Sequence, residues 1–310
     1  MRTSRLCLAV LALYTLAAVW GECAYRAARL HDRTPAYNRV NEAHRNQPPA
    51  FVRPWARPDA AGDDNAIATD GRDTTVGLPV RLRFWEYPLG SDNLGRDVLQ
   101  RLLQGTRIAF HVGVMTSLIA LPLGVLLGCL GGYFGGRADS LVVWLCATVS
   151  AIPSLLLILA VSLVVGKGLA GVYWGIGLTT WVSVCRSIRA EVIKHRERTY
   201  VQAARVLGYS HARVLFRHIL PNVMHIVLIA FSIRFPAAVA TEVFVSFLGI
   251  GVQGEPSWGV MLNNARLRLW QGVWWEMTFV TLAIFGLVLV FNILADQLRD
   301  QLDPNVMREA

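Results

Sequence analysis

The sequence lacks the local patterns with which proteins commonly bind nucleotides or carry out catalysis. It has no Gly-x-x-x-x-Gly-Lys-Ser/Thr segment, whose backbone N–H groups hold phosphates, because its single Gly-Lys pair, Gly166 and Lys167, is followed by another glycine. It also has no His-Glu-x-x-His pair, no nucleophile elbow and no Cys-His arrangement. We therefore expect no catalytic or cofactor-binding residue on this chain.

Metal-binding spacing is absent as well. The five cysteines lie within or beside apolar runs and have no metal or redox spacing, which is typical of core residues. His211, His218 and His225 follow one another at seven-residue intervals. Seven helical residues span about 10.5 Å, too far for two side chains to share one ion without a bend, and Pro221 interrupts the run. We expect no metal site.

Charged residues are scarce, and lysine occurs only at Lys167 and Lys194. With 54% hydrophobic residues and a mean hydropathy of +0.41, the chain is too apolar for a soluble domain with a polar surface. The net charge of +9 would suit a nucleic-acid partner, but the arginines flank apolar runs, so membrane topology explains them better. We predict an integral membrane protein without a nucleic-acid partner.

Six apolar runs are long enough to cross a bilayer. Backbone polar groups cannot go unpaired in lipid, and the alternation of a membrane barrel is absent, so we predict an all-α protein with six transmembrane helices. The first run could instead be a signal peptide; we prefer a retained helix because the orientation of the later spans needs it. The runs are residues 6–25, 108–130, 141–165, 169–185, 223–249 and 277–295.

Charge sets the expected orientation. Residues 186–222 carry eight Arg/Lys against two Glu, so the positive-inside rule places this loop in the cytoplasm and both termini with it. We expect residues 1–25 to be the first span, 26–107 to be extracytoplasmic, 108–295 to be a five-helix core and 296–310 to be a cytoplasmic tail.

The extracytoplasmic segment is polar, with 13 basic and 10 acidic side chains. Residues 47–73 are rich in proline and aspartate and predict a loop, with a small binding domain as the alternative. From Arg96 onward, apolar residues recur at helical spacing, which suits an interfacial helix on the membrane surface.

The basic loop contains its own helix signals. Thr199 and Gln202 fit a capping box, so we expect a helix over residues 200–207. Gly208 can adopt the left-handed conformation that ends a helix, Ser210 can cap a second one, and Pro221 would terminate or kink it.

Isolated helices this short are marginal in water, so the helix over residues 200–207 needs a surface to pack against. Ala203 and Ala204, in its middle, allow another surface to approach closely. These features predict a docking element, and an amphipathic surface turn is the alternative.

Arg234 and Glu242 are charged residues inside the fifth predicted span. Such residues usually face a cavity or a partner, because exposure to lipid is unfavourable. They lie eight residues apart, about 12 Å along a helix, so they do not pair directly unless Pro236 bends the path. Lining a translocation path and structural pairing with neighbouring helices remain equal alternatives.

Four segments resemble ABC importer permeases of the peptide and nickel subgroup. The basic loop resembles the cytoplasmic Glu-Ala-Ala motif, with Gln202 in place of the glutamate. Residues 87–109 resemble the HPLGTDxxGRD signature of the subgroup, and residues 46–50 resemble the stretch that usually leads directly into it. Residues 242–262 resemble its E-x-x-LSFLGLG…PSWG segment. The signature matches at Gly90, Asp92, Gly95, Arg96 and Asp97, among others.

This resemblance implies a type I permease fold in a bacterial cytoplasmic membrane, with a cytoplasmic coupling helix. It further implies a homologous permease partner, an extracytoplasmic solute-binding protein, membrane lipid and two ATPase subunits, which would hold the ATP and Mg²⁺. The ATPase-coupling residues it implies are Thr199, Tyr200, Gln202, Ala203, Ala204, Gly208, Leu220 and Pro221.

The favoured hypothesis is therefore a transporter subunit that is not itself an enzyme, most similar to the C-type permease of dipeptide and oligopeptide importers. An importer of nickel or another small solute is the alternative within the family. A self-contained channel or receptor, and a membrane enzyme, are the alternatives outside it.

Overall fold

The computed structural model describes residues 2–31, 34–52 and 87–302, and these are helical with no strand among them. Short 3-10 turns lie at Ala36–Asn38, Glu42–His44 and Leu269–Gln271, and a π-helix lies at Val214–Ile219. The α-helices are α1 (Arg2–Leu30), α2 (Val98–Phe134), α3 (Gly136–Ala151), α4 (Ser154–Val165), α5 (Leu169–Arg196), α6 (Thr199–Val206), α7 (His211–Arg213), α8 (Leu220–Phe247), α9 (Trp258–Arg266) and α10 (Trp275–Leu302).

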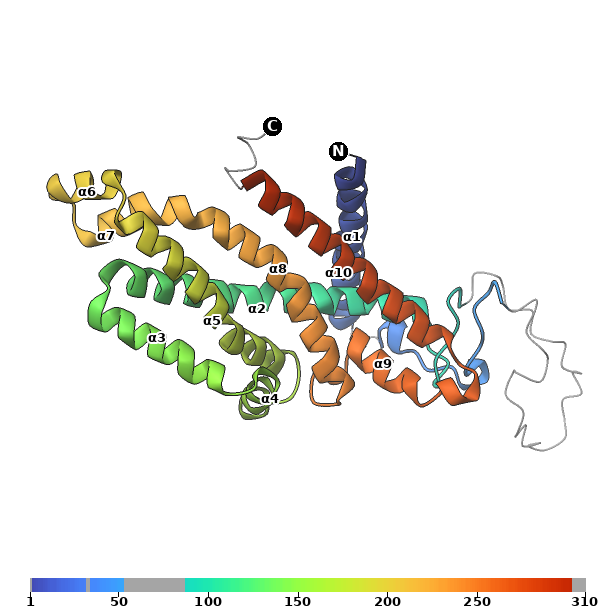
Figure 1. Ribbon diagram of the computed structural model, residues 1–310. Coiled ribbons are helices and arrows are strands. Elements are labelled where there is room, and N and C mark those ends of the chain that lie inside the picture. Colours follow the sequence, from blue (N-terminus) through green and yellow to red (C-terminus); the bar gives the residue numbers. More distant parts are fainter. Residues whose placement is uncertain (1, 32–33, 53–86, 303–310) are drawn as a thin grey trace, which may run out of the picture.

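The long helix α2 is the axis of the fold (Figure 1). Its glycines let α5 approach closely: a Cβ at Gly124 would lie 2.6 Å from Val184, and one at Gly132 would lie 2.8 Å from the carbonyl oxygen of Arg189. Small residues are a common device for close helix packing in membranes, where apolar side chains gain little by leaving lipid. The glycines of α2 therefore allow the close contact between α2 and α5.

Four helices, α1, α2, the run α7–α8 and α10, are long and apolar enough to span a membrane, and a fifth span results if α3 and α4 are counted together. The predicted span over residues 169–185 coincides with α5, which does not meet the same test of length and composition. The all-α membrane architecture is therefore confirmed, and the count of six spans is not.

The predicted single span over residues 141–165 is wrong in shape. The chain bends by 91° between α3 and α4. Ile152 adopts an extended backbone because it precedes Pro153, whose ring disfavours a helical conformation at the residue before it. The pair is a broken span or a re-entrant loop.

The predicted separate interfacial helix is also corrected. Residues 98–107 are the first turns of α2, which continues without a break for 37 residues, or about 55 Å. Asp97 caps its start by accepting from the N–H of Leu99 at 2.9 Å. Burial raises the pKa of the Asp97 carboxyl, against the effect of the N–H groups that bind it. Arg101, Gln104 and the other side chains of this stretch pack within the chain.

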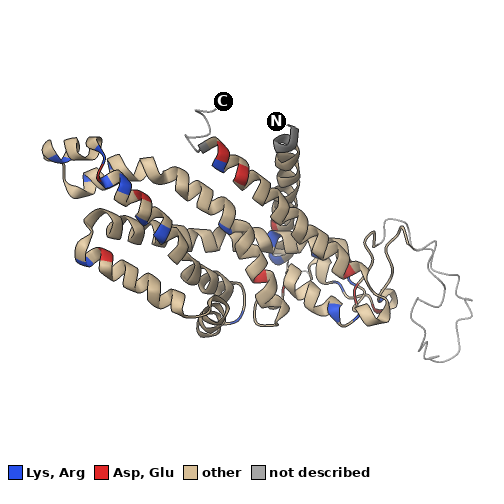
Figure 2. Cartoon of the chain, in the orientation of Figure 1, with Lys and Arg blue, Asp and Glu red and all other residues tan. Residues whose placement is uncertain are grey.

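Charged residues occur in several places along the chain (Figure 2). Groups of them lie around α6 and α7, near α9 and the start of α10, at the end of α10 and where α1 meets α2, whereas α4 and the middle of α10 carry none. The beginning of α1, the end of α10 and the α6–α7 region lie toward one side of the molecule, whereas α4 and α9 lie toward the other (Figure 1).

The two stretches on either side of residues 53–86 lie against each other. The N–H of Asn46 donates to the carbonyl of Asp92 at 3.0 Å, and the N–H of Ala50 donates to that of Pro88 at 3.2 Å. The stretch that resembles the lead-in to the signature is therefore adjacent to it in space. The predictions for residues 53–73 and 303–310 fall outside the described residues.

Because the stretches that flank residues 53–86 are hydrogen-bonded to each other, we predict that a short Gly-Ser linker can replace residues 53–86. The hydrogen bonds that join the flanking stretches do not involve this segment, so the variant should reach wild-type levels in the membrane with unchanged thermal stability after extraction. A matched variant that also removes residues 41–52 should lose stability. Failure of the first variant to accumulate would show that the segment contributes to the fold.

Candidate functional site

The corner formed by α6 and α7 is held from inside by apolar packing. Val201 is fully buried and Ala204 nearly so, and both lie in a cluster with Ile188 and Val192 of α5 and Val214 of the π-helix. Full burial of a valine side chain contributes about 1.5–3 kcal/mol, which is substantial for an eight-residue helix that would be marginal alone. Of the predicted alanine pair, Ala204 therefore faces this chain, and Ala203 is left exposed.

The predicted capping box at the start of α6 is wrong. The N-cap is Arg198, whose carbonyl accepts from the N–H groups of Val201 and Gln202, so Thr199 is already helical and makes no capping bond. The Gln202 amide instead donates to the carbonyl of Glu197 at 3.2 Å. The helix begins one residue earlier than predicted because Arg198, with an extended backbone, occupies the position that the hydroxyl was expected to take.

The end of α6 agrees with the prediction. Gly208 has a left-handed backbone, with φ of 77°. Its N–H donates to Arg205, and the N–H of Tyr209 donates back to Ala204 at 3.1 Å, which is a Schellman motif. Ser210 then caps α7 by accepting from the N–H of Arg213 at 3.4 Å. The reversal between the helices is thus fixed by local backbone chemistry.

Pro221 does not terminate the second helix. It lies at the second position of α8, and the chain runs without interruption from α7 through the π-helix. Pro221 has no N–H, and its ring would clash with the carbonyl four residues earlier in a regular α-helix. The wider π turn, closed by the N–H of Leu220 on the carbonyl of Leu215, accommodates the proline.

Aromatic contacts attach this corner to the end of α2. The Tyr133 hydroxyl lies 3.0 Å from Nδ1 of His211, and the guanidinium of Arg205 lies over the Tyr133 ring at 5.1 Å. His218 stacks on Tyr209 instead. The two histidines therefore point to different aromatic partners, and the described residues contain no cluster of His, Cys, Asp or Glu placed to hold a metal.

The outer face of the corner is apolar and uncovered. Val206 is 87% exposed and Leu207 is 72% exposed, directly before the glycine turn. Arg198, Arg205 and Arg213 are also exposed. An apolar patch surrounded by cationic side chains on a short, immobilised helix is suited to binding another protein. The corner thus has one face packed against this chain and another face exposed for binding.

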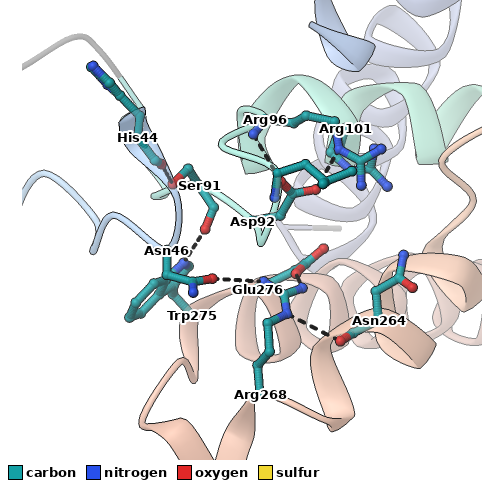
Figure 3. A network of polar contacts seen from close by, with 11 residues as sticks. His44, Asn46, Ser91, Asp92, Arg96, Arg101, Asn264, Arg268, Trp275 and Glu276 are labelled. Atoms are coloured by element: carbon teal, nitrogen blue, oxygen red, sulfur yellow. Dashed lines mark hydrogen bonds and ion pairs between the residues drawn. The ribbon is translucent and has the colours of Figure 1, made fainter. Parts of the chain in front are cut away.

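The family-signature residues build a buried turn at the opposite end (Figure 3). The Asp92 carboxylate accepts from the N–H groups of Leu94 and Arg96, each at 2.9 Å, and from the Arg96 side chain at 2.7 Å. It also lies 3.6 Å from Nε of Arg101. Gly95 has a φ of 68°, and a Cβ there would lie 1.8 Å from the carbonyl oxygen of Asn41.

A second buried ion pair lies beside this turn. Arg268 binds the carboxylate of Glu276, and its other contacts are the carbonyl of Asn264 at 3.3 Å and the side chain of Asn46 at 3.4 Å (Figure 3). Trp275 donates its indole N–H to the carbonyl of Ser91 at 3.0 Å. The start of α10 is thereby joined to the signature turn and to the segment before residue 53.

Arg107 joins three segments far apart in sequence. Its Nε lies 2.6 Å from a carboxylate oxygen of Glu22 on α1, and its Nη1 lies 2.8 Å from one of Glu255 before α9. The guanidinium also lies 3.8 Å from the centre of the Tyr25 ring. Sequence analysis did not predict these pairings; the available signal was an acidic residue at the end of the first apolar run.

The signature segment, residues 87–109, is in direct contact with the other family-like segment, residues 242–262. A Cβ at Gly105 would lie 2.4 Å from the ring of Trp258, and the indole N–H of Trp258 donates to the carbonyl of Leu102 at 3.1 Å. Ser257 caps α9 by accepting from the N–H of Val260. The glycine of one motif therefore makes room for the tryptophan of the other.

Arg234 and Glu242 lie apart on the continuous helix α8, which Pro236 does not break. Glu242 is buried inside the chain and accepts a hydrogen bond from Ser246 at 2.7 Å. Arg234 is only partly buried and has no such partner among the described residues. The structure thus separates the two candidate path residues into one that is satisfied internally and one that is not.

Comparisons with known proteins identify related chains. The sequence profile described as "Binding-protein-dependent transport system inner membrane component" matches residues 120–308. The dipeptide transport system permease protein DppC of Bacillus subtilis (strain 168) is 36% identical over 236 residues, which cover 76% of this chain and 73% of that protein. The glutathione transport system permease protein GsiD of Pectobacterium atrosepticum is 38% identical, covering 70% of this chain and 72% of that one.

A solved structure of similar fold describes inward-facing conformations of the MetNI methionine ABC transporter. It superposes with a TM-score of 0.52 at 18% identity, covering 65% of this chain and 95% of that one. At this identity the likeness concerns the fold alone.

The corrected cap gives a direct prediction. Thr199→Ala should leave the free energy of unfolding unchanged, because the Thr199 hydroxyl makes no capping hydrogen bond. Ser210→Ala should lower the free energy of unfolding by about 1 kcal/mol, because it removes the hydroxyl that caps α7. Thermal unfolding of both variants in detergent, or hydrogen exchange of the α6–α7 amides, would measure the difference. A larger effect of Thr199→Ala than of Ser210→Ala would show that the Thr199 hydroxyl caps α6 and would contradict this prediction.

Proposed function

The chain belongs to the family of binding-protein-dependent transport system inner membrane components, and from this we propose that it is the C-type permease subunit of an ATP-driven importer of dipeptides or oligopeptides. The relatives support a peptide cargo, since their names specify dipeptide, oligopeptide and glutathione transport. Nickel or another small solute is the alternative cargo, and nothing in the structure favours it.

The α6–α7 corner is the observation that carries the proposal. A helix of eight residues is fixed from inside by Val201 and Ala204 and presents exposed Val206 and Leu207 outward. Because the sequence has no phosphate-binding loop, the energy for transport must come from another subunit. A rigid, apolar and basic corner at one end of the membrane helices is suited to receiving motion from such a subunit.

The assembly that we propose contains a homologous permease, two ATPase subunits holding ATP and Mg²⁺, and an extracytoplasmic binding protein, in the lipid of the bacterial inner membrane. We place the α6–α7 corner and both termini in the cytoplasm. In support, the start of α1, the end of α10 and the corner lie toward the same side (Figure 1), and the loop carries the excess of arginine. The residues that we propose to couple the ATPase to the membrane helices lie within residues 199–221.

Gly208 provides the test. Gly208→Val forces a β-branched residue into a left-handed backbone, which is unfavourable by roughly 1–2 kcal/mol and should tilt α6 away from its partner. In proteoliposomes containing all subunits, this variant should assemble and hydrolyse ATP but lose uptake of a dipeptide. Gly272→Val is the matched control, because Gly272 has a similar φ of 79° and open space around it but lies between α9 and α10.

Normal uptake by Gly208→Val, or equal loss in Gly272→Val, would contradict a coupling role for the corner. Omission of the ATPase should abolish uptake by the wild-type complex. ATP-driven uptake without that subunit would reject the proposed function itself.

A further inference from the structure

Arg234 is a cationic side chain within a membrane span that has no ion pair or hydrogen bond among the described residues. It lies in the middle of α8, and the nearest acidic residue on that helix, Glu242, is about 12 Å further along and is bound by Ser246. An unpaired charge inside a membrane is strongly unfavourable, and such residues mark functional sites. The partner of Arg234 must therefore come from outside the described part of this chain.

Arg234 lines a small cavity between three helices. The cavity holds about 50 Å³, room for a few small atoms but not for a whole peptide. It is open on one side, so a ligand group can enter it. The lining comes from α2, α5 and α8 and consists of Thr116, Ser117, Ala120, Ile176, Thr180, Arg234, Ala237, Ala238 and Thr241.

The four hydroxyl groups of the lining share one hydrogen-bonding pattern. Each donates its proton to a carbonyl of its own helix, as Thr180 does to Ile176 at 2.8 Å and Thr241 does to Ala237 at 2.8 Å. Thr116 and Ser117 donate to α2 in the same way, at 2.7 and 2.6 Å. Each oxygen therefore retains only acceptor capacity toward the cavity. The site offers one cationic donor and a set of neutral acceptors.

A peptide end has the complementary chemistry. Its terminal carboxylate accepts the paired donors of a guanidinium, and the amide N–H beside it donates to a hydroxyl oxygen. We propose that Arg234 binds the C-terminal carboxylate of the peptide cargo in transit, with the cavity hydroxyls accepting the adjacent N–H. This inference rests on the proposed peptide-import function and adds the chemical group that the membrane path recognises.

Arg234→Gln tests the inference, with Arg234→Lys as the variant that keeps the charge. Arg299→Gln is the control, since it removes one exposed arginine near the end of α10. Each is assembled with partner permease, ATPases and binding protein in proteoliposomes, and complex recovery, basal ATP hydrolysis and dipeptide uptake are measured. We expect Arg234→Gln to assemble and hydrolyse normally but to lower uptake at least about tenfold, the ratio typical of one charge-assisted hydrogen bond. Arg234→Lys keeps the charge but not the paired donors, so its uptake should fall between that of Arg234→Gln and wild type, and Arg299→Gln should retain all of it.

The chemical group is tested with a dipeptide carboxamide. For each variant, uptake is divided by wild-type uptake of the same cargo, so weaker loading of the binding protein cancels. The loss in Arg234→Gln should be confined to the free carboxylate. Equal loss with the carboxamide, or unchanged uptake of the carboxylate, would overturn the inference. Loss of assembly in Arg234→Gln would overturn it in favour of a carboxylate on the partner permease. Absence of peptide uptake by the wild-type complex would instead reject the proposed function, and this inference with it.

Discussion

A charged side chain cannot remain unpaired in the apolar interior of a membrane protein, and Arg107 shows how far this constraint organises the chain. Its guanidinium binds Glu22 on α1 and Glu255 before α9, and Glu22 also lies 3.3 Å from Nε2 of His111 on α2. Removing either carboxylate would leave a buried charge partly uncompensated, which is usually more unfavourable than losing an exposed ion pair. Arg107 thus links both α1 and the α8–α9 connection to α2.

Helix α2, which carries Arg107, also reaches the α6–α7 corner. Helix α2 begins beside the Asp92 turn, passes Arg107 and carries Tyr133 at its last turn, where Tyr133 contacts His211 and Arg205. Glycines on α2 seat it tightly against α5, whose end leads into α6. Packed helices therefore connect the corner to the Asp92 turn, and in the proposed function a displacement at the corner would reach that turn through them. Arg234 and its cavity lie between these two ends.

Local chemistry was the part of the structure that the sequence could predict. Gly208 and Ser210 adopt the expected conformations because a left-handed glycine and a serine cap depend on only a few neighbouring residues. The predicted capping box at Thr199 is wrong by one residue, because Arg198 occupies the N-cap position of α6. Which residue occupies that position depends on where α5 ends. The bend at Pro153 had a visible signal, but hydropathy measures composition and carries no information about direction.

Pairings across long distances could not be predicted. Arg107 and Glu255 lie 148 residues apart, and Arg268 with Glu276 becomes buried only when α10 packs on the signature turn. The family motifs identified the residues that form the Asp92 turn. They did not predict that Gly105 of one motif makes room for Trp258 of the other. These contacts follow from the packing of helices, which no single segment determines.

In the proposed importer, the exposed apolar tip of α6 touches a separate ATPase. Crosslinking from a photoreactive amino acid at Val206, with Trp270 at the opposite end as the matched position, tests this contact, because these side chains are 87% and 95% exposed. In membranes containing the complete transporter, we predict adducts with the ATPase from position 206 and none from position 270. ATPase adducts from position 270, or none from position 206 in a complex that retains the ATPase, would contradict the account.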